Sequence, residues 1–207
     1  KKISLSTISG EERHGIVHRL DKGTSGVMVV AKTNEAHLGL SKQLEDKSMG
    51  RYYLAIVDMP LKENIIVEKP IGRNSNNRLK MSIEENGRNA KSAFSKIALS
   101  NNEKFELVAC KLYTGRTHQI RVHLSSMNRH ILGDNLYGFK GELNKINRFY
   151  LHAYYLYLTH PITNKQMSFK ANLPNDMDEF LNINFKKEDI NDKLNENNIV
   201  SNFNTFI

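Results

Sequence analysis

Short apolar runs, many of them alternating with polar positions, set the pattern of this 207-residue chain. Segments rich in β-branched and aromatic side chains predict strands, because such side chains suit a pleated, partly buried surface. The continuous apolar run at 27–31 predicts a fully buried strand. Further strands are predicted at 51–57, 65–67, 79–83, 93–99, 105–110, 150–159 and 166–171, with polar turns at 72–74 and 86–87.

Helical patterns are confined to a few stretches. Asn34 is predicted to cap a helix that runs to about residue 47, and Thr117 to cap a second helix. A third, short helix is predicted at 176–181. Consecutive strands with few helices indicate an α+β fold built on a largely antiparallel sheet.

The end of the chain differs in composition from the rest. Residues 183–207 are rich in Asn, Lys and Glu, and their hydrophobic side chains show no clear period. We therefore expect one domain at 1–182 and a C-terminal extension at 183–207, either disordered or docked through Phe203 and Phe206. The polar start, 1–15, carries no apolar signal core, so we expect a protein that is not secreted and a start that continues from an upstream segment.

Charge narrows the class of partner. The net charge of +8 and the isoelectric point near 9.5 favour a polyanion such as RNA, DNA or anionic lipid. Charge alone is weak support, and the frequent Asn and Lys also fit an AT-rich genome. No stretch approaches the roughly 20 apolar residues that span a bilayer, so no membrane role is expected. The single cysteine, Cys110, excludes an intrachain disulfide.

A polar loop at 18–26 precedes the apolar run at 27–31 and holds one acid, Asp21, between Arg19 and Lys22. Positive charge nearby lowers the pKa of an aspartate by about 1–3 units, and an ionised carboxylate at a strand end suits a nucleophile. The alternative is a turn in which Asp21 only hydrogen-bonds the loop backbone. The loop taken alone favours that alternative.

A second polar segment occupies 114–123. Gly115 and Thr117 predict a tight turn into a helix N-terminus, where free N–H groups, reinforced by Arg116, would attract phosphate. Arg121 lies one turn further and can project toward a site at the start of the helix. The alternative is a solvated basic helix face.

Two tyrosines stand next to each other on the strand at 51–57. Alternation sends Tyr52 and Tyr53 to opposite faces, so one should pack in the core while the other faces a cleft, where it could stack on a base or exchange a proton. Two half-buried tyrosines in a sheet are the alternative. The histidines are scattered and no metal-binding motif occurs, so we expect no metal.

Taken together, these segments resemble the signatures of the RluA-type (RluA/RluC/RluD) RNA pseudouridine synthases. The loop HRLDKGTSG at 18–26 resembles the first signature, and Tyr53 with Ala55 the second. TGRTHQIRVH at 114–123 resembles the third. ILGDNLYG at 131–138, and LHA at 151–153 followed by HP at 160–161, are similar to later signatures of the family. The resemblance covers about residues 13–174.

The chain departs from this family in two ways. Arg51 stands where members usually carry Lys, which keeps the basic charge. The family's earlier strand, with a Lys-Pro and a Gly before the first signature, is absent, as is the S4 RNA-binding domain that many members carry. We therefore expect the chain to be truncated at its N-terminus.

The resemblance implies a pseudouridine synthase fold and the isomerisation of specific uridines in RNA to pseudouridine, without a cofactor. It implies that Asp21 is the nucleophile, by attack at C1′ or C6 or by deprotonation of C2′. It also implies that Arg121 pairs with Asp21 and that Tyr53 stacks on the uracil and handles the C5 proton. The target uridine must be flipped out of its stem, and Arg19 is placed to fill the gap.

The RNA contacts implied by the resemblance form a second set of site residues. They are His18, Arg19, Thr24, Arg116, His118 and Gln119. The partner is expected to be rRNA or tRNA and the protein a monomer, in the cytoplasm or an organelle. A catalytically silent RNA-binding module on the same scaffold is the alternative function.

Overall fold

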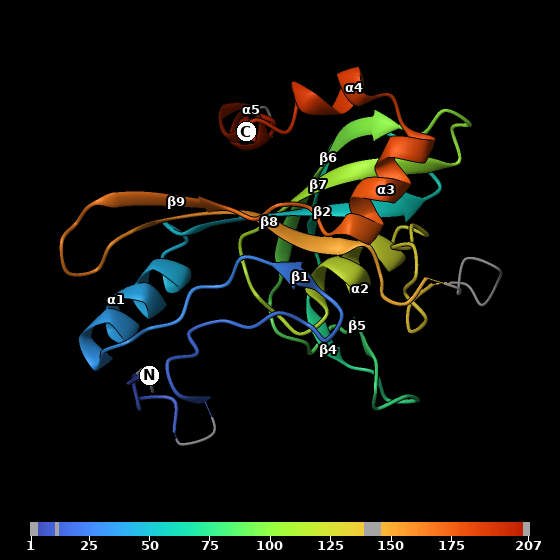
Figure 1. Ribbon diagram of the computed structural model, residues 1–207. Coiled ribbons are helices and arrows are strands. Elements are labelled where there is room, and N and C mark those ends of the chain that lie inside the picture. Colours follow the sequence, from blue (N-terminus) through green and yellow to red (C-terminus); the bar gives the residue numbers. More distant parts are fainter. Residues whose placement is uncertain (1–3, 11–12, 139–145, 205–207) are drawn as a thin grey trace.

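The computed structural model describes residues 4–10, 13–138 and 146–204, and a largely antiparallel seven-stranded sheet runs through its centre (Figure 1). Its strands follow the order β1-β8-β2-β7-β6-β3, with β9 paired to β8. Among the strands of the described residues, only β1 and β8 run parallel to each other. The predicted α+β class is confirmed. The strands are β1 (Ser25–Gly26), β2 (Gly50–Asp58), β3 (Ile65–Glu68), β6 (Lys91–Leu99), β7 (Phe105–Leu112), β8 (Leu151–Thr159) and β9 (Gln166–Lys170).

A separate hairpin joins β4 (Ile71–Arg73) to β5 (Met81–Ile83). The turn predicted at 72–74 was therefore wrong in its first two residues. Ile71 is buried against Ala90 and Val122, which draws this segment into a strand. The reversal lies further on, where Asn74 Oδ1 accepts hydrogen bonds from the backbone at 76 and 77.

The buried strand predicted at 27–31 was wrong. Val27 N still donates to Ala153 O, but Val29 N donates to the His18 ring, and Met28 is 40% exposed. The chain therefore leaves the sheet after β1. Val27 and Val29 pack instead beside α1 (Asn34–Glu45), in a cluster around Leu40. A short apolar run shows that a segment is buried, but does not show whether a neighbouring strand pairs with it.

Both predicted helix caps were wrong by one residue. The Thr33 hydroxyl, rather than Asn34, caps α1 by accepting a hydrogen bond from Ala36 N. The Asn34 side chain instead accepts hydrogen bonds from the N-terminal segment at 6–7. The second helix, α2 (Gln119–Ser125), begins after His118, which has a left-handed φ of 57° and makes no side-chain cap. Thr117 is therefore not its cap.

The two faces of the sheet carry different helices. Tyr52, Leu54 and Ile56 point toward α3 (Asn175–Asn184), α4 (Lys187–Asn191) and α5 (Glu196–Ser201), which cover one face. Tyr53 and Ala55 point to the other face, where α2 packs. Figure 1 shows α1, α2 and the β4–β5 hairpin on this second side. The opposite facing of the two tyrosines is confirmed.

The C-terminal segment is docked on the first face. Phe203 is buried, and its ring centroid lies 5.5 Å from that of Tyr52. Phe206 lies outside the described residues. The division at residue 182 stays a prediction, and α3 continues across it. In the part of the chain that the structure describes, no helix is long and apolar enough to cross a bilayer.

Candidate active site

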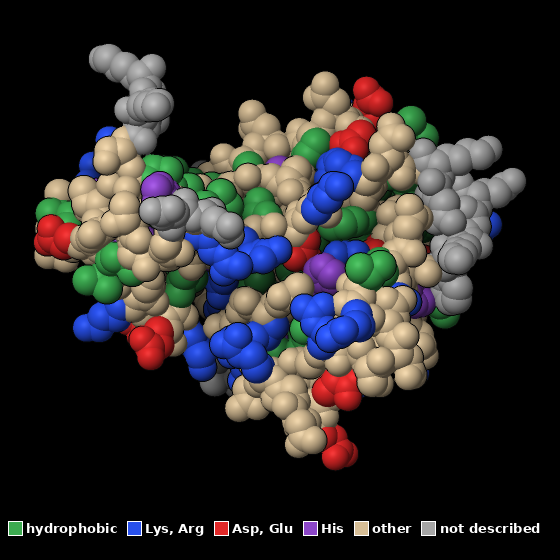
Figure 2. Space-filling view, turned by 90° about the horizontal axis from the view of Figure 1, so that it is seen from below, with side chains coloured by type: hydrophobic (Ala, Val, Ile, Leu, Met, Phe, Trp, Pro, Cys, Tyr) green, Lys and Arg blue, Asp and Glu red, His purple; other side chains and the backbone are tan. Residues whose placement is uncertain are grey.

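A cleft of about 1280 Å³ opens on the face of the sheet that carries Tyr53. Asp21 lies in its wall, and the loops before α1 and before α2 form its sides. Figure 2 shows Lys and Arg side chains gathered around the hollow on this side of the molecule. Among the described lining residues, two are acidic, Asp21 and Glu45. Six are cationic: Arg13, Arg19, Lys47, Arg51, Arg88 and Arg116.

The loop that carries Asp21 is anchored in the middle of the sheet. Gly26 of β1 pairs with Ala153 of β8, and Ala153 pairs in turn with Tyr53 of β2. Gly26 has a φ of 116°, and its Cα lies so close to the Ala153 backbone that no side chain would fit there. The Ser25 hydroxyl also hydrogen-bonds the His152 ring at 2.8 Å. The register of the sheet therefore places Asp21 in the same cleft as Tyr53.

Arg121 connects Asp21 to a second acid that the sequence analysis did not place in the site. Its Nη1 lies 3.5 Å from Asp21 Oδ2, while its Nε and Nη2 donate to the two Asp134 oxygens at 2.7 and 2.8 Å. Asp134 is 3% exposed and Arg121 is 6% exposed. The guanidinium lies between the rings of Tyr137 and Phe149, with centroids at 4.9 and 4.4 Å. Its position is therefore fixed on every side.

This environment keeps Arg121 charged. Burial by itself lowers the pKa of the guanidinium, but the hydrogen bonds and charge of Asp134, together with the charge of Asp21, outweigh it and raise the pKa. A fixed positive charge beside Asp21 favours the ionised carboxylate. The predicted pairing of Arg121 with Asp21 is present in the geometry.

Tyr53 is the tyrosine that faces the cleft. It is 5% exposed, and burial raises the pKa of its phenol to about 12, although the nearby charge of Arg51 acts in the opposite direction; the charge of Asp21 adds to the rise. The hydroxyl therefore keeps its proton at neutral pH. Tyr52 lies on the other face, among aromatic rings, where it cannot reach this cleft.

The first signature contributes three more predicted residues, and all three line the cleft. Arg19 is exposed. The Thr24 hydroxyl is buried and has no hydrogen-bond partner among the described residues. Burial, with the charge of Arg51, lowers the pKa of His18 to about 4, so its ring is neutral.

The hydrogen bonds of the segment before α2 mainly hold its own loop in place. The Gln119 amide makes four hydrogen bonds, to the Thr114 hydroxyl, Arg116 N, Lys91 O and the Ser92 hydroxyl. It therefore holds the loop in place, and its role as an RNA contact stays a prediction. The backbone N–H of Arg116, which precedes the helix, is already used in this way.

Two more residues of this segment were predicted to bind substrate. Arg116 lines the cleft, and its Nε donates to Asn89 O at 2.9 Å. His118 Nδ1 lies 2.8 Å from the Tyr137 hydroxyl, outside the residues that line the cleft, and burial lowers its pKa. No group of three metal-binding side chains occurs among the described residues.

Comparison with known proteins shows what the chain is similar to. A family model described as RNA pseudouridylate synthase matches residues 1–126. An uncharacterized RNA pseudouridine synthase of Helicobacter pylori is 48% identical over 98% of this chain and 64% of its own length. The ribosomal large subunit pseudouridine synthase D of Zymomonas mobilis is 43% identical over 84% of this chain and 57% of its own length. The chain thus spans less than two thirds of these relatives.

The fold is similar to that of solved structures as well. Human RNA pseudouridylate synthase domain containing 1 superposes with a TM-score of 0.69 at 28% identity, over 79% of this chain and 71% of that one.

Proposed function

Because the chain belongs to the RNA pseudouridylate synthase family, we propose that it isomerises uridine in RNA to pseudouridine with Asp21 as the nucleophile. One observation carries this proposal: a partly exposed carboxylate, in a basic cleft, beside a buried arginine that a second acid holds in place.

The reaction needs one carboxylate and no cofactor. The N1–C1′ bond of uridine breaks, the uracil turns, and a C5–C1′ bond forms, while the hydrogen on C5 is lost and N1 gains one. Nothing is oxidised and no group is exchanged with water. Attack at C1′, attack at C6 and deprotonation of C2′ all start from the ionised form of Asp21.

Arg121 supports this chemistry without taking part in bond formation. Its charge stabilises the ionised carboxylate of Asp21, and its two hydrogen bonds to Asp134 hold it in place before substrate arrives. A group that is oriented beforehand does not have to reorganise during the reaction.

Tyr53 is the proposed partner of the base. Its ring lies in the cleft that holds Asp21, and its phenol is protonated at neutral pH. It can stack on uracil, and its hydroxyl can relay the C5 proton by passing its own proton on as it takes up the one that leaves C5.

The basic wall of the cleft is proposed to hold the RNA backbone. A uridine in a stem must be flipped out, at a cost of a few kcal/mol, and the exposed Arg19 next to this loop is proposed to fill the gap. Because relatives that are 43% and 41% identical are named for the ribosomal large subunit, large-subunit rRNA is the first substrate to test.

Asp21→Asn tests the assignment. Tritium release from RNA labelled with [5-³H]uridine should fall by several orders of magnitude, as expected when a nucleophile is removed. Folding stability should change by about 1 kcal/mol or less, because Asn keeps the shape of the side chain, the lost ionic contact is long at 3.5 Å, and Arg121 keeps its two hydrogen bonds to Asp134. RNA affinity should be retained.

Asp178→Asn, an exposed change on α3, is the matched control and should leave all three measurements unchanged. Near wild-type tritium release from Asp21→Asn would show that Asp21 only caps its loop. A wild-type chain that binds RNA but releases no tritium would instead indicate a silent RNA-binding module.

A further inference from the structure

Arg51 is a buried cation whose one favourable electrostatic neighbour among the described residues is the Tyr53 phenol. It lies on β2, two residues before Tyr53 and on the same face, and it lines the cleft. The residue is 7% exposed, yet its guanidinium makes no hydrogen bond or ion pair with the described residues, and its Nε is buried without an acceptor. Its Nη1 packs against Gly115, where a side chain would leave it too little room.

Comparison with Arg121 shows how unusual this is. Arg121 is buried to the same degree, and it contacts two carboxylates at three nitrogen atoms. Removing a guanidinium from water is costly unless an anion or several acceptors replace the water. For Arg51 the described part of the protein supplies neither, so its geometry calls for an anion that comes from outside.

His18 presents a second donor in the same cleft. Its Nε2 accepts a hydrogen bond from Val29 N at 3.1 Å, so the proton of the neutral ring sits on Nδ1. This N–H is buried and has no acceptor among the described residues. Because the charge of Arg51 lowers the pKa of His18, the two groups are close enough to interact.

We propose that Arg51 and the Nδ1–H of His18 form a subsite for one phosphodiester of the RNA backbone, next to the base position at Tyr53. This rests on the proposed function, which makes RNA the substrate. A guanidinium fits the oxygens of a phosphate with parallel hydrogen bonds, and the phosphate charge offsets its burial. A uracil carbonyl is neutral and would leave the charge uncompensated. Carboxylates do not occur in RNA.

The consequence is a fixed register between backbone and base. One particular phosphate must enter the cleft before the uracil reaches Tyr53. The six cations of the cleft wall then have two different roles. Arg51 binds one particular phosphate, while exposed residues such as Arg88 attract the RNA backbone without selecting a position on it.

The test compares ligands that do and do not carry phosphate. Uridine and uridine 3′,5′-bisphosphate are titrated into the full chain, with binding followed by NMR, including the His18 ring nitrogens. The bisphosphate should bind wild type about tenfold or more tightly than uridine, as expected for charge-assisted hydrogen bonds. Arg51→Gln should remove most of that difference, and Arg51→Lys should keep part of it. His18 Nδ1 should shift on binding of the bisphosphate and not of uridine.

Arg88→Gln removes an equal charge from the exposed rim of the same cleft and is the matched control. It should leave most of the phosphate preference intact. Equal loss of uridine and bisphosphate binding in Arg51→Gln would place Arg51 on the base and overturn the proposal. An undiminished phosphate preference in Arg51→Gln, or the absence of such a preference in wild type, would overturn it as well.

Thermal stability supplies a readout that needs no RNA. A buried cation without an internal partner should not stabilise the fold, so Arg51→Gln should keep the Tm of wild type in phosphate-free buffer. Inorganic phosphate should then raise the Tm of wild type more than that of the variant. A large fall in Tm in phosphate-free buffer would reveal an internal partner and end the proposal. These results do not depend on pseudouridine formation, so a failure of Asp21 as nucleophile is distinguished from a failure of this subsite.

Discussion

Asp134 should carry more stability than any other acid near the cleft. Its carboxylate accepts two hydrogen bonds from Arg121, at 2.7 and 2.8 Å, and two more from the backbone N–H groups of Leu136 and Tyr137, at 3.1 Å. Asp134→Ala removes all four. Arg121, 6% exposed, would keep only the 3.5 Å contact with Asp21.

The size of the effect follows from this geometry. Removing one partner of a buried ion pair costs about 3–5 kcal/mol, because the other charge stays behind in the interior. The backbone donors left without an acceptor add to this, at roughly 1 kcal/mol each. Closer approach of Arg121 to Asp21 offsets part of the loss. We therefore expect a loss of about 3–5 kcal/mol, a large share of the roughly 5–15 kcal/mol that stabilises a typical domain.

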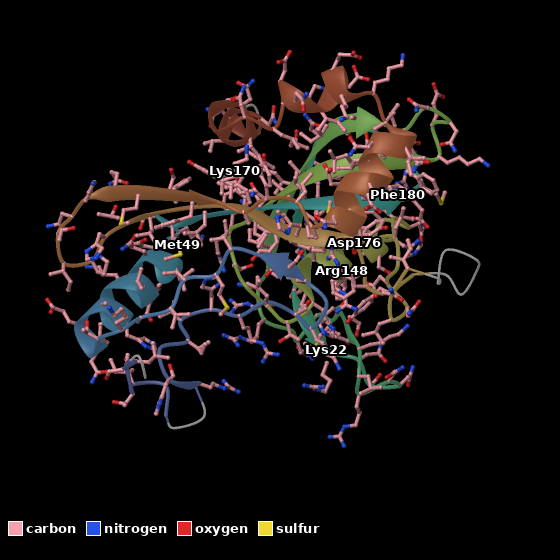
Figure 3. The ribbon with its side chains drawn as sticks, viewed as in Figure 1. Lys22, Met49, Arg148, Lys170, Asp176 and Phe180 are labelled. Atoms are coloured by element: carbon pink, nitrogen blue, oxygen red, sulfur yellow. The ribbon has the colours of Figure 1, made fainter. Side chains whose placement is uncertain are left out.

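A second ion pair in the same protein provides the control. Arg148 and Asp176 lie side by side in Figure 3 and are also joined by two hydrogen bonds, at 2.8 and 2.9 Å. The Asp176 carboxylate, however, is 42% exposed. Asp176 also accepts a hydrogen bond from Met177 N at 2.8 Å. Because solvent screens an exposed pair, Asp176→Ala should still cost only about 1–2 kcal/mol.

Urea unfolding of both variants gives the comparison directly. The midpoint should fall much further for Asp134→Ala than for Asp176→Ala, at an unchanged slope of free energy against urea. Asp134→Asn keeps the shape and removes the charge, so its loss should lie between the two. Equal small losses for Asp134→Ala and Asp176→Ala would refute the claim that burial of the Arg121 pair makes it structural.

Two further predictions concern catalysis and RNA binding. Tyr53→Phe should lower tritium release by about 100-fold or more if its hydroxyl moves a proton. Tyr52→Phe, on the opposite face, should stay within about twofold of wild type. The reverse ranking would show that the wrong tyrosine was assigned to the cleft. RNA affinity should fall as salt rises. If about four phosphates are neutralised, the slope of log K against log salt should be near −3. A flat response would contradict binding through the basic cleft wall.

The parts of the fold that the sequence predicts well are those with strong alternation. β2 is an exception, because its residues 52–57 are all apolar or aromatic; its pairing on both sides and the opposite facing of neighbours still assign Tyr52 and Tyr53 to different clusters. The run at 27–31 shows the limit. Its residues are as apolar as those of a strand, yet beyond Val27 its backbone contacts the His18 ring and the segment at 15–16, which only the tertiary structure can supply.

Some residues of the candidate site could likewise be predicted from the sequence, and others could not. Asp21 and Arg121 lie in ordered signatures that resemble a known family, and the structure brings them together. Asp134 belongs to the later signature at 131–138, but nothing local marks its role, because its partner lies 13 residues earlier on α2. The spare donors of Arg51 and His18 were equally hidden, since a residue without a partner cannot be recognised before the partners of its neighbours are known.

The unequal sharing of Arg121 between two acids shows how one residue can support Asp21, the proposed nucleophile, without blocking it. A bidentate contact to Asp21 would engage both carboxylate oxygens and lower their reactivity. Instead Asp134 takes the two short hydrogen bonds and fixes the guanidinium, and Asp21 receives a single longer contact through Oδ2. Among the described residues nothing hydrogen-bonds Asp21 Oδ1. That oxygen remains available for the proposed reaction, while the interior of the protein holds the positive charge of Arg121 at a constant distance from Asp21.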